Sequence, residues 1–163
     1  MNMRRSILWA VRVMVCVLGF TGCAWAAPLE TGLPVELTAG SAILLEADTG
    51  TVIFEKNADE RRPVASITKL MTLLLTLEEL EAGRLAPGDG GTVSGNAAGQ
   101  IGSQALLDAG AVYPLKDLLR STIIASANDA AVALAEHIAG TEADFARLMN
   151  ARAQELGMGD TCY

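Results

Sequence analysis

Several kinds of residue are scarce in this sequence, and each scarcity narrows what the chain can be. There is one histidine, there are three cysteines, and only 4 % of the residues are aromatic. Basic residues are also few, since 12 lysines and arginines stand against 19 acidic residues, for a formal net charge of −7. An acidic chain repels a phosphate backbone, so we expect no nucleic-acid partner. The 51 % apolar composition is that of a globular chain, and 163 residues allow one domain.

The first 26 residues have the features of a secretory signal peptide. Two arginines lie within the first five positions, residues 7–20 are mostly apolar, and Ala-Trp-Ala at 24–26 is a small-residue cleavage pattern. Arg12 interrupts the apolar run, which argues against a stable membrane span. We therefore expect residues 1–26 to be removed, residues 27–163 to form the domain, and the protein to be exported.

Removal of this segment leaves a single cysteine. Cys16 and Cys23 lie within it, so Cys162 has no partner and no internal disulfide can form. The net charge of the remaining chain is −10, because three arginines and no acidic residue leave. Lipidation at Cys23 is an alternative, although the phenylalanine that opens residues 20–23 is a poor start for a lipoprotein signal.

Short apolar runs and a glycine-rich connection follow. Residues 41–46 and 51–56 flank Ala-Asp-Thr-Gly, which predicts a β-hairpin. Between residues 84 and 111 glycine recurs and long apolar side chains are few, so we expect short extended pieces and turns. Such a connection is either one wall of a site or a flexible surface loop.

Apolar spacing predicts three helices in the C-terminal half, at 115–125, 129–139 and 141–156. The second has Asn128 or Asp129 as its expected cap and Gly140 as its stop. Thr141 and Asp144 fit a capping box for the third. The only histidine, His137, lies in the middle of the second of these helices and has no visible catalytic role.

Another helix is predicted at residues 66–81, after Pro63 and before Gly83. At 100° per residue one apolar arc contains Ser66, Leu70, Leu73, Leu74, Leu77 and Leu80. The opposite side contains Thr68, Thr72, Thr76 and Glu79. Lys69 lies at the border of the apolar arc, three residues after Ser66, so the two side chains are neighbours.

This pair has the chemistry of an activated serine. An ammonium beside an apolar face loses hydration, which favours its neutral, basic form, and a neutral amine next to a hydroxyl can activate a serine nucleophile without histidine. The alternative is structural: Ser66 as a helix cap and Lys69 as a surface lysine whose stem covers apolar area. Ser-x-x-Lys is common by chance, so a second motif must decide between the two.

That second motif is Ser126-Ala127-Asn128, on the short link between two predicted helices. A hydroxyl and a carboxamide there suit proton transfer and binding of a substrate carbonyl near a serine–lysine pair. Helix capping is again the alternative. The same spacing recurs in Ser94-Gly95-Asn96, within the glycine-rich connection and without helices on both sides.

Together the two motifs resemble those of the serine-acylating penicillin-recognising enzymes. Residues 63–72, 118–140 and 149–158 are similar to the D-alanyl-D-alanine carboxypeptidases among the low-molecular-mass penicillin-binding proteins, peptidase family S11. The resemblance covers the chain from about residue 41 onward. It implies an α/β (α+β) fold of the β-lactamase and DD-peptidase type, with a helical cluster against an antiparallel sheet.

The resemblance also implies a role for each motif residue. Ser66 would attack the carbonyl between the two terminal D-alanines of a peptidoglycan pentapeptide stem, and Lys69 would take its proton. Ser126 would pass protons to the leaving amine, and Asn128 would hold Lys69 and the substrate amide. The Ser66 backbone N–H, at a helix N-terminus, would belong to the oxyanion hole. No cofactor and no metal are implied, β-lactam antibiotics would be covalent inhibitors, and the bacterial periplasm or cell envelope would be the location.

One family motif is missing. Lys56, Lys69 and Lys116 are the only lysines, and none precedes Thr-Gly or Ser-Gly, whereas the family has Lys-Thr-Gly on a strand of the site. We therefore interpret residues 27–163 as the N-terminal part of the catalytic domain, with a sheet incomplete at its C-terminal end. Membrane association would come only through lipidation or through segments that this sequence does not contain.

Three alternatives to a carboxypeptidase stay open. An inactive fragment would explain the missing strand, and a DD-endopeptidase of the same family would differ only in its product. A class A β-lactamase shares Ser-x-x-Lys, but it has Asp where Ala127 stands and needs a deacylating glutamate that the sequence does not place.

Overall fold

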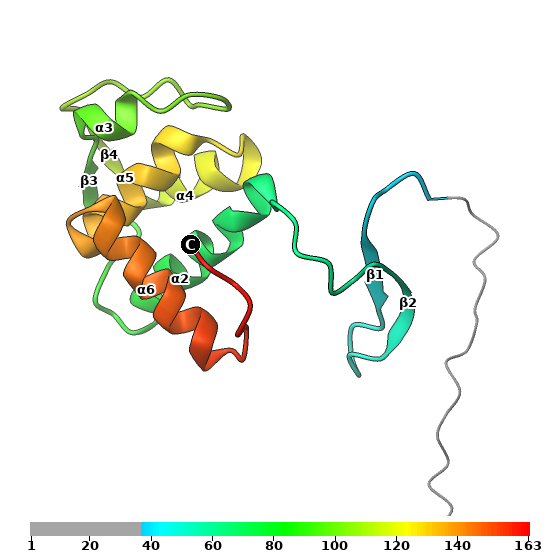
Figure 1. The fold of residues 1–163 in the computed structure, drawn as a ribbon. Coiled ribbons are helices and arrows are strands. Elements are labelled where there is room, and N and C mark those ends of the chain that lie inside the picture. The colour runs from blue at the N-terminus through cyan, green and yellow to red at the C-terminus, as the bar shows by residue number, and fades with distance from the viewer. Residues whose placement is uncertain (1–36) are drawn as a thin grey trace, which may run out of the picture. The chain divides into compact units, whose positions relative to one another are not determined.

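The computed structural model describes residues 37–163, which form two compact units divided between Arg61 and Arg62 (Figure 1). The predicted signal peptide, its cleavage site and the lipidation alternative at Cys23 lie outside the described residues. Among the described residues, no helix has the length and apolar character needed to cross a membrane.

The described part of the first unit is the predicted hairpin. Strand β1 (Ala42–Leu45) pairs antiparallel with β2 (Val52–Lys56), with Ala42 opposite Lys56. The Glu46 carboxylate organises the turn, because it accepts hydrogen bonds from the Thr49 hydroxyl at 2.6 Å and from the Thr49 N–H at 2.7 Å. These bonds, with one from the Asp48 N–H, hold the pKa of Glu46 below its ordinary value.

The second unit contains the remaining elements. In chain order they are η1 (Ala65–Thr68), α2 (Lys69–Glu81), β3 (Gly90–Thr92), α3 (Gly95–Ala98), β4 (Val112–Pro114), α4 (Leu115–Ile124), α5 (Asn128–Ala139) and α6 (Glu142–Glu155). Strands β3 and β4 pair antiparallel. Helices with small antiparallel sheets agree with the predicted α/β (α+β) class.

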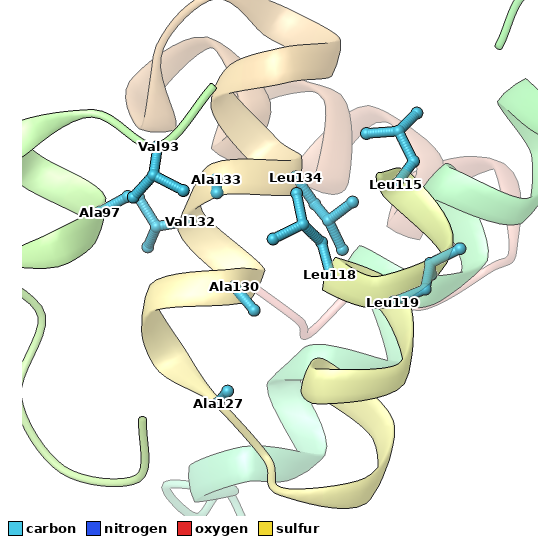
Figure 2. Close-up of a cluster of buried hydrophobic side chains, with 10 residues drawn as sticks. All are labelled: Val93, Ala97, Leu115, Leu118, Leu119, Ala127, Ala130, Val132, Ala133 and Leu134. Carbon is cyan, nitrogen blue, oxygen red and sulfur yellow. The ribbon is translucent and has the colours of Figure 1, made fainter. Parts of the chain in front are cut away.

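Helix α5 is the centre of this unit and packs against α2, α3, α4 and α6 (Figure 1). All its residues from 129 to 135 are buried, and four of them are alanines, which let neighbouring helices approach closely. Figure 2 shows the main core, in which α5 residues meet Leu115, Leu118 and Leu119 of α4. A second cluster joins α2, α5 and α6 through Met71, Phe145 and Met149, among others.

The three C-terminal helices agree with prediction to within two residues at each end. Gly140, at φ +83°, ends α5 as expected, and the Thr141 hydroxyl accepts from the Asp144 N–H at 3.0 Å to cap α6. The predicted cap of α5 was wrong. Its N-cap residue is Ala127, without a side-chain bond, because the Asn128 and Asp129 side chains bind another segment.

The apolar arc predicted for α2 is only partly covered, since Leu73, Leu74 and Leu80 pack against the core clusters and the other two leucines do not. Leu70 and Leu77 are 65 % and 52 % exposed, whereas Thr72 and Thr76, placed on the opposite side by the periodicity, are buried with Met71. The Thr76 hydroxyl donates to the Thr72 carbonyl at 2.7 Å, so it can be buried without an unsatisfied donor. Periodicity finds the apolar side of a helix but does not say which side its neighbours cover.

Candidate active site

Ser66 and Lys69 lie where the one-turn helix η1 runs into α2. The Lys69 Nζ donates a hydrogen bond to the Ser66 Oγ at 3.2 Å. In a 3₁₀ turn residues i and i+3 lie one above the other, so this local geometry brings the two side chains together. Ala65, just before the serine, has φ +47°, a left-handed backbone that is strained in any residue but glycine.

Ser126 joins this pair from a distant part of the sequence. It lies on the link between α4 and α5, and the Lys69 Nζ donates to its Oγ at 3.3 Å across 57 positions of sequence. Lys69 therefore lies between two hydroxyl groups. Ser126 also has a left-handed backbone, with φ +54°, so strained residues occur on both sides of the lysine.

The link carrying Ser126 is tied to α4. The N–H groups of Ala125 and Ala127 both donate to the Ser121 carbonyl, at 3.1 Å and 3.2 Å. These two bonds bracket Ser126 and fix the backbone on either side of it.

Asn128 lies at the same site but makes a different contact from the one expected. Its Nδ2 donates to the Ile101 carbonyl at 2.5 Å, and its backbone N–H donates to the Ser103 carbonyl at 2.7 Å. Within residues 37–163 no hydrogen bond joins Asn128 to Lys69, so the expected hold on the lysine is absent from this structure. The side chain instead fixes the glycine-rich connection against the start of α5.

A cavity of about 590 Å³ opens beside these groups, within the second unit. Its walls come from η1 and α2, from α5 and from α6, and Ser66, Lys69 and Asn128 are among its lining residues. Gln100 also lines it, so the glycine-rich connection forms part of one wall, as one of the two sequence interpretations held. The rest of the lining is largely apolar and includes Phe145 and Met149.

Burial lowers the pKa of the Lys69 ammonium from its ordinary value. The direction agrees with that expected from the position of Lys69 beside an apolar surface. A lower pKa increases the share of neutral amine, the form that accepts a proton from a hydroxyl.

The sequence offered further candidates in the Ser94–Asn96 motif and in His137, and their contacts or positions indicate structural roles. The competing Ser94 caps α3 by accepting from the Ala97 N–H at 2.9 Å, and Asn96 binds Glu136 and Glu142. His137 lies in the last turn of α5, not in its middle as the sequence suggested, and it is not among the cavity's lining residues. In the part of the chain that the structure describes, no group of three histidine, cysteine or acidic side chains is placed to hold a metal ion.

Sequence reasoning missed the role of one residue next to the site. The Asp129 carboxylate, whose residue is only 1 % exposed, accepts from the N–H groups of Ala105 and Leu107 at 3.0–3.1 Å. Between these two donors Leu106 has φ +58° and is 81 % exposed. The sequence contained one signal for it, an acidic residue directly after the Ser-x-Asn motif, which was read there only as a helix cap.

We expect Leu106→Gly to stabilise the protein. A left-handed leucine costs about 1–2 kcal/mol, glycine adopts the same backbone freely, and the exposed side chain contributes little burial. After the greater chain entropy of glycine is allowed for, a gain of about 0.5–1 kcal/mol in the free energy of unfolding remains, measurable by urea denaturation. The matched change Leu107→Gly removes a side chain that packs on the core and should destabilise instead. Destabilisation by both changes would contradict the assigned strain.

Comparison with known proteins defines the class first. The chain resembles the crystal structure of the D-alanyl-D-alanine carboxypeptidase DacD from Francisella tularensis, with a TM-score of 0.76 and 39 % identity over 79 % of this chain and 31 % of that one. It also resembles penicillin-binding protein D2 from Listeria monocytogenes in its ampicillin-bound form, with a TM-score of 0.60 and 32 % identity over 76 % of this chain and 48 % of that one. The fold is that of the penicillin-binding DD-peptidases.

The chain belongs to the D-alanyl-D-alanine carboxypeptidase family, peptidase family S11, whose profile matches residues 27–163. Among curated relatives, the D-alanyl-D-alanine carboxypeptidase DacF of Bacillus subtilis (strain 168) is 45 % identical over 125 residues. That match covers 77 % of this chain and 32 % of the relative. The chain thus spans about a third of the length of this relative.

Proposed function

We propose that this chain carries the acylating half of a serine-type D-Ala-D-Ala carboxypeptidase, which removes the terminal D-alanine from peptidoglycan stem peptides. The observation that carries the proposal is Lys69 Nζ within hydrogen-bond distance of both Ser66 Oγ and Ser126 Oγ, at 3.2 Å and 3.3 Å, beside an open cavity. Membership of the carboxypeptidase family supports the choice of substrate.

The reaction begins with transfer of a proton from the Ser66 hydroxyl to the neutral amine of Lys69. The Ser66 Oγ forms a bond to the carbonyl carbon of the penultimate D-alanine, giving a tetrahedral intermediate with a negative oxygen. Ser126 passes a proton from the lysine to the leaving nitrogen as the C–N bond breaks, and free D-alanine departs. Water then hydrolyses the ester and restores the Ser66 hydroxyl.

The negative oxygen needs donors at the moment it forms. We assign one of them to the Ser66 backbone N–H, because η1 leads directly into α2 and the N-terminal end of a helix favours negative charge. Asn128, at the cavity wall, is the proposed partner of the substrate amide.

The proposed nucleophile and substrate also explain the proposed inhibitors and the proposed location. A β-lactam ring presents a strained amide that Ser66 would open to form an ester, and the ampicillin-bound state of the Listeria monocytogenes relative supports β-lactams as ligands. Peptidoglycan lies outside the cytoplasm, so export to the periplasm or cell envelope fits this substrate.

The test is covalent labelling of the full chain. Folded protein, checked by circular dichroism, is incubated with a fluorescent penicillin, and its intact mass is measured. We expect one penicilloyl group per chain, and D-alanine release from a synthetic peptide that ends in D-Ala-D-Ala. Folded protein that forms no adduct would contradict the proposal.

The products separate the alternatives. Cleavage of a cross-linked peptide without release of terminal D-alanine would indicate an endopeptidase. Fast turnover of penicillin without a lasting adduct would indicate a β-lactamase.

A further inference from the structure

The Asp129 carboxylate is buried, and its partners are backbone N–H groups. Its Oδ1 accepts from Ala105 at 3.0 Å and from Ala130 at 2.8 Å, and its Oδ2 accepts from Ala105 and Leu107, each at 3.1 Å. None of these donors carries a charge. Among residues 37–163 the carboxylate is therefore held by peptide groups and not by an ion pair.

The segment that supplies these donors has the backbone geometry of an anion site. Leu106 is left-handed at φ +58° and lies between the two donors, so both N–H groups point to one place. Successive N–H groups around such a residue form a concave nest that binds anions. Here the anion comes from within the chain, and it ties residues 105–107 to the start of α5.

The charge on Asp129 is maintained despite its burial. Burial by itself raises the pKa of the carboxyl group, but the hydrogen bonds from the N–H groups of Ala105, Leu107, Ala130 and Leu106 outweigh it. The net effect holds the pKa of Asp129 below its ordinary value, so the group is ionised at neutral pH.

Asn128 anchors the same segment through Ile101 and Ser103, as described above. Two consecutive residues therefore hold residues 101–107, and the first of them lies two positions after Ser126. On the other side, the Ser121 carbonyl holds the link through Ala125 and Ala127. The left-handed backbone of Ser126 is thus restrained from both directions, and a strained backbone of this kind persists only where its surroundings fix it.

We propose that Asp129 is a positioning residue for Ser126: by binding residues 105–107 it fixes the start of α5 and keeps the Ser126 hydroxyl within reach of Lys69. The inference rests on the proposed function in that Ser126 is assigned a part in proton transfer. Asp129 itself does not touch the reacting atoms. Without it, the link is free to relax to a right-handed backbone, and the hydroxyl turns away from the amine.

The test uses Asp129→Ala, with Asp108→Ala as the matched control, because Asp108 is an exposed acid next to the same segment. The acylation rate with fluorescent penicillin should fall by about 10- to 100-fold in Asp129→Ala and stay unchanged in the control, since small displacements of reacting groups have effects of this size. Sodium formate, a small anion able to enter the vacated nest, should restore part of the rate in Asp129→Ala alone. A rate unaffected by Asp129→Ala would overturn the proposal.

A second measurement does not depend on activity. The chain has three lysines, at positions 56, 69 and 116, so protein labelled with ¹³C at the lysine ε-carbon gives three signals to titrate. We expect the Lys69 signal to shift in Asp129→Ala and to return towards its wild-type position with formate, while the other two stay fixed. Faster hydrogen exchange at residues 101–107 with no change at Lys69 would show a purely structural role.

The two measurements separate this inference from the proposed function. If wild-type protein forms no adduct but the Lys69 signal responds to Asp129→Ala, the function fails and the positioning role stands. If Asp129→Ala does not fold, Asp129→Asn replaces it, because asparagine keeps one carbonyl acceptor without the charge. This variant should show a smaller fall in the acylation rate and a smaller shift of the Lys69 signal. A fully wild-type Asp129→Asn in both rate and Lys69 signal would show that the charge has no part in positioning.

Discussion

Ser66→Ala should form no covalent adduct with fluorescent penicillin, while the wild-type chain is labelled once. The ester bond is made by the Ser66 Oγ, and alanine has no atom that can replace it. Removal of the nucleophile in a serine enzyme lowers the rate by about 10⁶-fold, which places labelling below detection in the time that saturates the wild type. Intact mass spectrometry and in-gel fluorescence are the measurements.

The control is Ser103→Ala, which removes an exposed hydroxyl near the site and keeps the backbone carbonyl that binds Asn128. It should be labelled at the wild-type rate. Because Ser66 is exposed, its loss should leave the folded structure intact. Labelling of folded Ser66→Ala, mapped by peptide mass to another residue, would move the nucleophile away from Ser66.

The local part of this site could be predicted from the sequence, because its geometry depends only on spacing. Ser66 and Lys69 are three residues apart at the start of a predicted helix, and that spacing alone makes them neighbours. The hairpin and the three C-terminal helices follow in the same way from apolar periodicity and from cap residues such as Thr141. Each of these patterns involves residues that are only a few positions apart in the sequence.

The long-range part could not be predicted in this way. Side-chain chemistry suggested a link between Ser126 and Lys69 and the family resemblance strengthened it, but nothing in a spacing of 57 positions brings the two residues together. Asn128 and Asp129 hold residues 101–107, and this contact depends on the left-handed backbone of Leu106. A glycine at that position would have indicated such a backbone in the sequence, whereas a leucine does not. The coverage of α2 was predicted incompletely for a related reason, because the side chains that pack on its Met71 side, among them Phe145 and Met149 of α6, come from far along the chain.

Replacement of Lys69 by methionine should slow acylation by about 10²–10⁴-fold, the usual contribution of a positioned general base. Methionine keeps an unbranched side chain of similar length and removes the amine that contacts both Ser66 and Ser126. The pH dependence should change as well. Only the neutral amine accepts the serine proton, so the wild-type rate should rise about tenfold per pH unit until the pH passes the pKa of Lys69 and then level off.

Burial lowers that pKa, so the rise should level off below the value of about 10.4 expected for an unperturbed lysine, and the rise should be absent in Lys69→Met. Stopped-flow measurement of penicilloyl formation between pH 6 and 10 provides both the rate and the profile. Lys116→Met removes an exposed lysine in α4 and should leave both unchanged. A wild-type rate in Lys69→Met would assign the base to another group. A wild-type rate that levels off at the pKa of an unperturbed lysine would mean that burial does not lower the pKa of Lys69.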